Sequence, residues 1–329
     1  MRKSWQEYYI DDRKLHEWLP WGGLVHENIL RNKDESLMAF FAYTKMNDQD
    51  LELPNIFFKN GWSVWSEYQC FQKEGHAYLI FCWNPYYYKK KYEWVINDLS
   101  GKAIHFNEMV PAFLKTLQIL EAALKTQVDI VRLKNTEVIE CLFSSLCMQP
   151  YIAEINKYPG YLDVQADQEI SFEVNTKCFI VNKKHIGIIS LLGYPDLKIL
   201  PLIPHDYRLS RRMLLFGAKE AKMELNRYMA EWSPNRKTVK NFLQENILGE
   251  FNGFYTNNLI FSHVDENELL KILNDVDSNF KRMGVPHIVE TNNSKDIWWG
   301  SIPGIFRANL NPPIVGLKDI TEMFTVKEN

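Results

Sequence analysis

The sequence predicts an α+β fold, in which mixed or antiparallel sheets pack against amphipathic helices, from two kinds of apolar pattern. Segments 36–44, 61–71 and 77–83 are short, apolar and aromatic, and residues 62–69 alternate between two faces as a strand does. Segments 107–125 and 265–284 instead repeat apolar residues every three or four positions, which is the spacing of one helix face. Length adds a third observation, because 329 residues suffice for one large domain or two, with a buried core.

The N-terminal portion of the chain, residues 1–150, is expected to form a β-rich unit followed by helices. Segment 19–23 breaks any helix that begins before it, and a polar turn at 31–35 leads into the first strong strand. Both faces of segment 61–71 are partly apolar, so this strand should be covered on each side, and segment 77–83 follows at hairpin distance. Helices are then predicted at 107–125 and 135–148.

The C-terminal portion, residues 151–310, is expected to be an α+β unit, with a hairpin over 177–194, a long helix over 218–232 and a strand over 253–264. The last helix has the clearest signals, since Asp265 is an N-cap residue, Glu268 its capping-box partner and Gly284 a helix-ending residue. A returning strand over 285–292 completes a strand–helix–strand unit. Residues 311–329 are expected to form a linker towards a missing ATPase domain.

Composition and charge exclude several classes of protein. The 38 Lys and Arg against 41 Asp and Glu leave a net charge of −3, which is neither strongly basic nor strongly acidic. The five cysteines include no C-x-x-C pair, so a zinc framework or thioredoxin-like motif is not predicted. The N-terminus lacks the apolar core of a secretory signal, and no run of about 18 apolar residues could span a bilayer.

The sequence also lacks the common catalytic and nucleotide-binding motifs. Its Gly-Lys dipeptide, Gly101-Lys102, has Ile96 at the place of the first P-loop glycine and is followed by Ala103. There is no G-x-G-x-x-G loop, no G-x-S-x-G elbow, and no metal-binding spacing among the eight histidines. We therefore expect no enzyme activity, no P-loop RecA-like domain, and no catalytic, cofactor-binding or metal residues in this chain.

Two clusters of cations leave a nucleic-acid role open as the alternative. Lys89–Lys91 stand among tyrosines, a combination that can contact phosphates and stack on bases. Arg208, Arg211 and Arg212 form the second cluster. The simpler interpretation of each cluster is structural: a solvated face for the lysines, and a helix-flanking face paired with carboxylates for the arginines.

Four blocks of sequence, in the right order, resemble the N-terminal region of the CagE/TrbE/VirB family of type IV secretion and conjugal transfer ATPases. The first block lies within 19–37, where the family pattern is matched by Leu19, Pro20, Trp21, Leu24, Val25, Asn32, Lys33, Asp34 and Ser36. Glu35 stands where the family has Gly, although Glu resists a positive φ. The other blocks are 61–69, 161–232 with its Tyr207-Arg208…Arg211 element, and 253–261 followed by 284–324.

The resemblance implies a function that depends on binding. Members of the family are hexamer-forming ATPases at the cytoplasmic face of the bacterial inner membrane. Their N-terminal region docks onto inner-membrane components and helps to assemble subunits, while a C-terminal domain binds ATP and Mg²⁺. For this chain the resemblance therefore implies a non-catalytic docking and assembly module, peripheral at the inner membrane, with secretion-system components and other copies of the ATPase as partners.

Candidate interface residues lie in three places. Trp21, Leu24 and Val25 belong to the first block, and Arg208 and Arg211 to the Tyr-Arg element. The third place precedes the proline-broken tail, with Trp298, Trp299, Pro303 and Gly304. Large aromatic residues can be either interface anchors or core anchors, and burial in the core is the simpler interpretation for the tryptophans.

Overall fold

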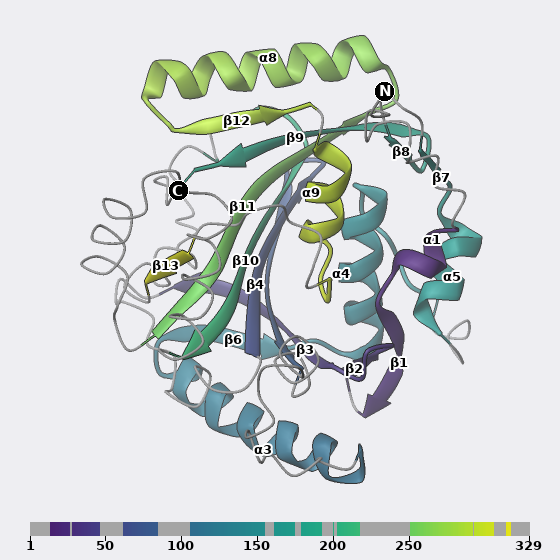
Figure 1. Ribbon diagram of the computed structural model, residues 1–329, viewed down its shortest axis with the longest axis vertical. Helices are drawn as coiled ribbons and strands as arrows, with labels where there is room; N and C mark the ends of the chain where they lie inside the picture. The colour runs from purple at the N-terminus through teal and green to yellow at the C-terminus, as the bar shows by residue number, and fades with distance from the viewer. Residues whose placement is uncertain are drawn as a thin grey trace, which may run out of the picture.

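One antiparallel sheet, covered by helices on both faces, organises the portion of the chain that the computed structural model describes (Figure 1). The described residues are 14–26, 28–46, 62–84, 106–154, 161–174, 179–192, 200, 203–217, 251–291, 293–305 and 314–316. The strands are β1 (Trp21–His26), β2 (Ile29–Asn32), β3 (Leu37–Met46), β4 (Trp62–Phe71), β5 (Glu74–Trp83), β6 (Val128–Arg132), β7 (Phe172–Val174), β8 (Phe179–Val181), β9 (Lys184–Leu191), β10 (Tyr207–Gly217), β11 (Phe251–His263), β12 (His287–Glu290) and β13 (Ile314–Gly316). The helices are α1 (Leu15–Trp18), α3 (Phe106–Lys125), α4 (Asn135–Cys147), α5 (Leu162–Glu169), α8 (Glu266–Met283) and α9 (Ser294–Ser301).

The strand order places β4 and β10 in the middle of the sheet. The path runs β1-β2-β3-β5-β4-β10-β11-β9-β8-β7, while β6 pairs with β3, β12 with β9 and β13 with β11. Every pair of strands is antiparallel, so the predicted α+β class with antiparallel pairing is confirmed. Because β4 pairs with β10, the sheet runs through both of the predicted units, and the division between them stays a prediction.

The helices form two layers. On one face α4 and α9 pack against the strands, joined by α1 and α5, over a core that includes Trp21, Trp65 and Trp298. On the other face α3 covers one end of the sheet and α8 covers the other. Figure 1 shows α3 and α8 at opposite ends of the molecule, with α4 and α9 between them. The central strands are therefore buried on both sides, as the two partly apolar faces of segment 61–71 predicted.

Helix α8 follows its sequence signals closely. The Asp265 side chain accepts hydrogen bonds from the backbone N–H groups of Asn267 and Glu268, and Gly284 ends the helix with a φ of 70°. One stripe of the helix, including Leu273, is buried against β9 and β11. Gly187 on β9 permits this close approach, because an added Cβ would lie 2.7 Å from a methyl carbon of Leu273.

The turn between β2 and β3 keeps a left-handed residue although it has no glycine. Glu35 adopts a φ of 69°, and its N–H donates to the carbonyl of Asn32 at 3.0 Å. Asp34 holds the other side of the turn, because its carboxylate accepts hydrogen bonds from the N–H and hydroxyl of Ser36. The turn therefore keeps the conformation that a glycine would favour, with Glu35 bearing the steric cost.

Two segments differ from the prediction. Trp21–Gly23 was expected in a helix-breaking turn but opens strand β1, after a single helical turn at α1. Strand β10 was not predicted, because its three arginines give it a polar composition that is untypical of a central strand. The predicted helix over 218–232, the lysine cluster at 89–91 and the Gly101-Lys102 dipeptide lie outside the described residues.

Candidate functional site

Three buried arginines of β10 form the centre of the candidate site. Arg208, Arg211 and Arg212 are exposed by 0%, 1% and 4%, respectively. Because side chains alternate along a strand, Arg208 and Arg212 point to the α4 and α9 face, and Arg211 points to the opposite face. Buried guanidinium groups need hydrogen-bond acceptors or counter-charges, so their partners define the site.

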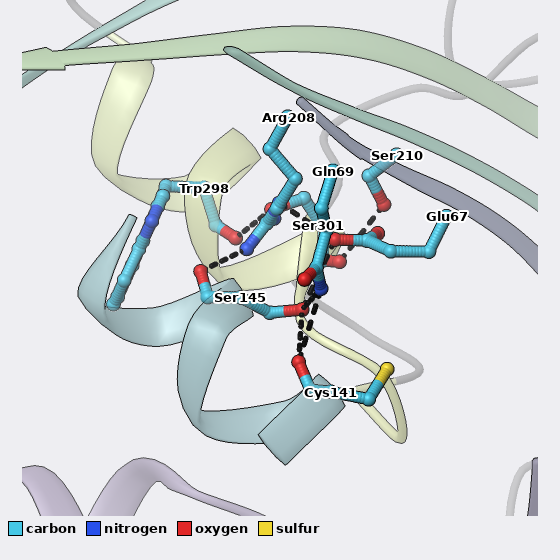
Figure 2. Close-up of polar contacts among 8 residues, drawn as sticks. All are labelled: Glu67, Gln69, Cys141, Ser145, Arg208, Ser210, Trp298 and Ser301. Atoms are coloured by element: carbon cyan, nitrogen blue, oxygen red, sulfur yellow. Dashed lines mark hydrogen bonds and ion pairs between the residues drawn. The ribbon is translucent and has the colours of Figure 1, made fainter. Parts of the chain in front are cut away.

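Arg208 joins a carboxylate to the ends of two helices. Its Nε lies 3.0 Å from Oε1 of Glu67 on β4, and both side chains are fully buried. Its two terminal nitrogens donate to the carbonyl oxygen of Ser145, in the last turn of α4, and to the hydroxyl of Ser301, the last residue of α9. Figure 2 shows the guanidinium between the two helix ends. Arg208 thus caps α4, whose last carbonyls lack helical partners.

Serine and glutamine side chains complete the connection. Gln69 on β4 donates to the Cys141 carbonyl at 3.0 Å and to Oγ of Ser145 at 2.9 Å. Ser145 Oγ also lies 3.0 Å from Oε1 of Glu67, so α4 contacts the same carboxylate as Arg208. Ser210, two residues after Arg208 on the strand, donates to the carbonyl of Ser301 at 2.9 Å. The network therefore ties β4, β10, α4 and α9 together without a large apolar contact.

Burial dominates the electrostatics of this network. It raises the pKa of Glu67 from its ordinary value, against the opposing influence of the Arg208 charge and the hydrogen bonds. It also lowers the pKa of Arg208, although Glu67 opposes that shift. The Cys141 thiol, buried beside Glu67, has its pKa raised well above the usual value, again chiefly by burial. This sulfur is consequently a protonated, inert thiol near neutral pH.

Arg212 holds the end of α9 and the turn that follows it. Its Nη1 donates to the carbonyl of Gly300 at 3.2 Å and to that of Ile305. From the opposite side, the indole N–H of Trp21 on β1 donates to the Pro303 carbonyl at 2.8 Å. The turn over residues 301–305 is therefore fixed both by the central strand and by the N-terminal strand, 282 positions away in the sequence.

Arg211 lies in a separate polar cluster on the other face of the sheet. Its Nη2 donates to the hydroxyl of Ser66 at 3.0 Å, and the Tyr43 hydroxyl lies 3.3 Å from the same oxygen. Burial raises the pKa of Tyr43, while the nearby Arg211 charge opposes the shift. Arg211 therefore belongs to the sheet interior between α3 and α8 and takes no part in the Arg208 network.

The structure brings most of the predicted interface residues into the core. The side chains of Trp21, Trp298 and Trp299 are exposed by 0–2%, and Trp298 and Trp299 contact each other with ring centroids 4.7 Å apart. The buried predicted residues near α9 are Trp21, Arg208, Trp298, Trp299, Pro303 and Gly304. Their burial fits the core-anchor interpretation. Leu24 and Val25 reach solvent, with Val25 exposed by 40%.

Sequence reasoning missed the partners of the arginines. Glu67, Gln69, Ser145, Ser210 and Ser301 were not singled out, although all are buried. A signal was present in segment 61–71, where Glu67 and Gln69 fall on alternate positions of a strand expected to be covered on both sides. A charged residue at such a position indicates a buried counter-charge. The identity of that counter-charge depends on the β4–β10 register, which no local pattern contains.

The described residues contain no group of three or more His, Cys, Asp or Glu side chains placed to hold a metal ion. Within the same residues, no helix has the length and apolar character needed to cross a membrane. The Arg208 network has its hydrogen-bonding groups directed at backbone carbonyls and at one carboxylate. What this arrangement can do chemically is to fix two helix ends on a sheet, with no path for a substrate to reach it.

Fold and site together define a large α+β sheet domain whose central charges hold its own helices. The chain is 21% identical, over 401 aligned positions, to "Conjugal transfer protein TrbE" of Rhizobium radiobacter, with 93% of this chain and 48% of that protein covered. It is 23% identical over 195 positions to a probable conjugal transfer protein TrbE of Sinorhizobium fredii (strain NBRC 101917 / NGR234), with 50% of this chain and 29% of that protein covered. No family model matches the chain.

The resemblance to TrbE-type proteins is thereby confirmed. The match to the Rhizobium radiobacter protein extends along nearly the whole chain, so it includes both the N-terminal strands and the Arg208 network. The chain spans about half the length of that relative.

Proposed function

We propose that this chain is the docking and assembly region of a TrbE-type component of a conjugation or type IV secretion system, and that it works by binding rather than by catalysis. The observation that carries the proposal is the match to a conjugal transfer protein over 93% of the chain and about half of the relative. In this proposal ATP and Mg²⁺ belong to the other half of such a protein. The partners are inner-membrane components of the secretion system and neighbouring copies of the same protein, at the cytoplasmic face of the inner membrane.

The distribution of polar groups supports a binding role. The buried arginines stabilise the positions of α4 and α9, so recognition is left to surface residues. Exposed apolar side chains are available for it near the N-terminal strand and around α5, including Val25, Val164 and Tyr161, with exposures of 40%, 44% and 69%. Side chains of this kind, rimmed by polar residues, are typical of protein-binding surfaces.

Co-purification from a conjugative host tests the docking proposal. A tagged chain should retain inner-membrane proteins of the secretion system when membranes are solubilised in mild detergent. The matched control is the same chain in a strain that lacks only the secretion genes. A Val25→Asp variant should retain less of these proteins, because it adds a charge to an exposed apolar position. Identical sets of proteins from both strains would contradict the proposal.

The alternative, a module that handles transferred DNA, loses one of its two supports. Arg208, Arg211 and Arg212 are at most 4% exposed, so their guanidinium groups cannot contact phosphates while the sheet is folded. The alternative therefore depends on Lys89–Lys91, outside the described residues. A fluorescence-anisotropy titration with single-stranded DNA tests it, because phosphate contacts give affinity that falls steeply with salt. Absence of binding at low salt would eliminate it.

A further inference from the structure

Strand β12 presents an unpaired edge of the sheet. It pairs with β9 on one side, and among the described residues no strand pairs with its other side. The N–H of Leu192 donates to the carbonyl of Pro286, so hydrogen-bonded pairs alternate from there along the two strands. By this alternation Ile288 and Glu290 direct their backbone groups at β9, while the N–H and C=O groups of His287 and Val289 point outwards.

An apolar side chain lies at the centre of this edge. Ile288 is 48% exposed, and the neighbouring Leu192 is also 48% exposed. Ile288 pairs with Ser190, so its side chain lies on the face opposite α8. Natural sheets usually protect an edge with charges, a proline or a covering segment, and an exposed apolar residue at the middle of an edge marks a place where another strand can add.

We infer that β12 is the contact between two copies of this chain, which pair their β12 strands antiparallel about a two-fold axis through Ile288. In this register His287 of one copy lies opposite Val289 of the other, and the outward N–H and C=O groups of both exchange hydrogen bonds. The two Ile288 side chains then meet at the axis, where the non-hydrogen-bonded pair brings them closest. An edge that is complementary to itself in this way gives a closed dimer.

The charges on α8 favour a second copy as the occupant. The helix covers the sheet beside β12, as Figure 1 shows, and the two-fold operation sets the two α8 helices antiparallel on the same face. Its amino end carries Glu266 and Glu268, and its carboxyl end carries Lys281 and Arg282. The acidic end of each helix therefore lies on the side of the basic end of the other, which is the charge complementarity of a specific contact.

The inference deepens the proposed function by assigning the contact between neighbouring subunits. It rests only on the self-assembly component of that proposal, since the retention of inner-membrane proteins is measured separately. A monomeric chain that still retains those proteins would overturn the β12 contact and leave docking intact. A dimer that retains none of them would do the reverse.

Sedimentation velocity of the purified full chain, from about 1 to 100 μM, tests the contact. The wild type should show a concentration-dependent dimer. Ile288→Lys should raise the dimer dissociation constant at least about tenfold, because it opposes two like charges at the axis. Ile152→Lys is the matched control, at a position 82% exposed and far from β12 in the sequence, and should leave the constant unchanged.

A charge exchange on α8 separates pairing between copies from the effect of charges on one helix. Glu268→Arg and Arg282→Glu should each weaken the dimer, and the double variant should recover it, because two-fold pairing sets opposite helix ends together. A monomer at every concentration would overturn the inference and leave the edge to a strand of another protein. A dimer that is indifferent to Ile288→Lys, or a double variant that is weaker than both single ones, would also overturn it.

Discussion

Removal of the Arg208 guanidinium should be among the most damaging single changes in the protein. Arg208→Met leaves the Glu67 carboxylate, which is fully buried, without its counter-charge at 3.0 Å. Breaking a buried ion pair from one side typically costs about 3–5 kcal/mol. The variant also loses the hydrogen bonds to the Ser145 carbonyl and the Ser301 hydroxyl, so we expect the free energy of unfolding to fall by about 4 kcal/mol or more.

A double-mutant cycle isolates the contribution of the pair. Glu67→Gln should cost about 3 kcal/mol, because Arg208 keeps its two helix-end acceptors but loses its counter-charge. Glu67→Met combined with Arg208→Met removes both charges and should cost less than Arg208→Met alone, at about 2 kcal/mol, since only the helix-end acceptors are left unpaired.

Urea unfolding followed by tryptophan fluorescence measures these differences, because Trp298 and Trp299 are buried in the same core as α4. Arg282→Met is the matched control, since Arg282 is exposed at the end of α8, and should stay within about 0.5 kcal/mol of the wild type. If Arg208→Met cost no more than this control, or if the double variant cost the sum of the single changes, the account of a buried, coupled network would be refuted.

Three further predictions concern backbone conformation and capping. Gly304→Ala should cost about 1–3 kcal/mol in urea unfolding, because Gly304 has a φ of 92° and an added Cβ would lie 3.0 Å from buried neighbours; equal stability would contradict the fixed turn. Glu35→Gly should instead stabilise the protein by about 0.5–1 kcal/mol, since it relieves a left-handed Glu, and a loss would show that the side chain contributes more than the strain costs. Hydrogen bonds from the Glu268 and Asn267 N–H groups lower the pKa of Asp265 from 3.8, so the stability they contribute is present above that value and is lost as pH falls through the lowered pKa. Asp265→Asn keeps the cap without titrating, so thermal melts followed by circular dichroism should depend less on pH between 5 and about 2 than those of the wild type.

The elements with local signals were predictable from the sequence. The helix over 265–284 appears as α8 with its N-cap and C-terminal glycine, and segment 61–71 appears as β4, buried on both faces. Apolar periodicity and cap chemistry are properties of neighbouring residues, which is why they can be recognised without the fold.

The candidate site was less accessible, because its partners lie far apart in the sequence. Arg208 meets Ser301 across 93 positions and Ser145 across 63. The arginines of β10 gave the strand a surface-like composition, so the segment was not predicted as a central strand, although Leu209, Met213 and Leu215 alternate with polar residues. Only the packing of α4 and α9 on that face shows why a strand with three arginines can be buried.

The central claim is that this chain binds components of a secretion machine, and its binding to membranes tests that claim most directly. Inverted inner-membrane vesicles from two otherwise identical strains, one with and one without the conjugation genes, would be floated with purified chain, and the bound fraction measured. The account predicts saturable binding to the first vesicles, reduced by Val25→Asp, and little binding to the second. Equal binding to both, or binding to neither, would contradict it.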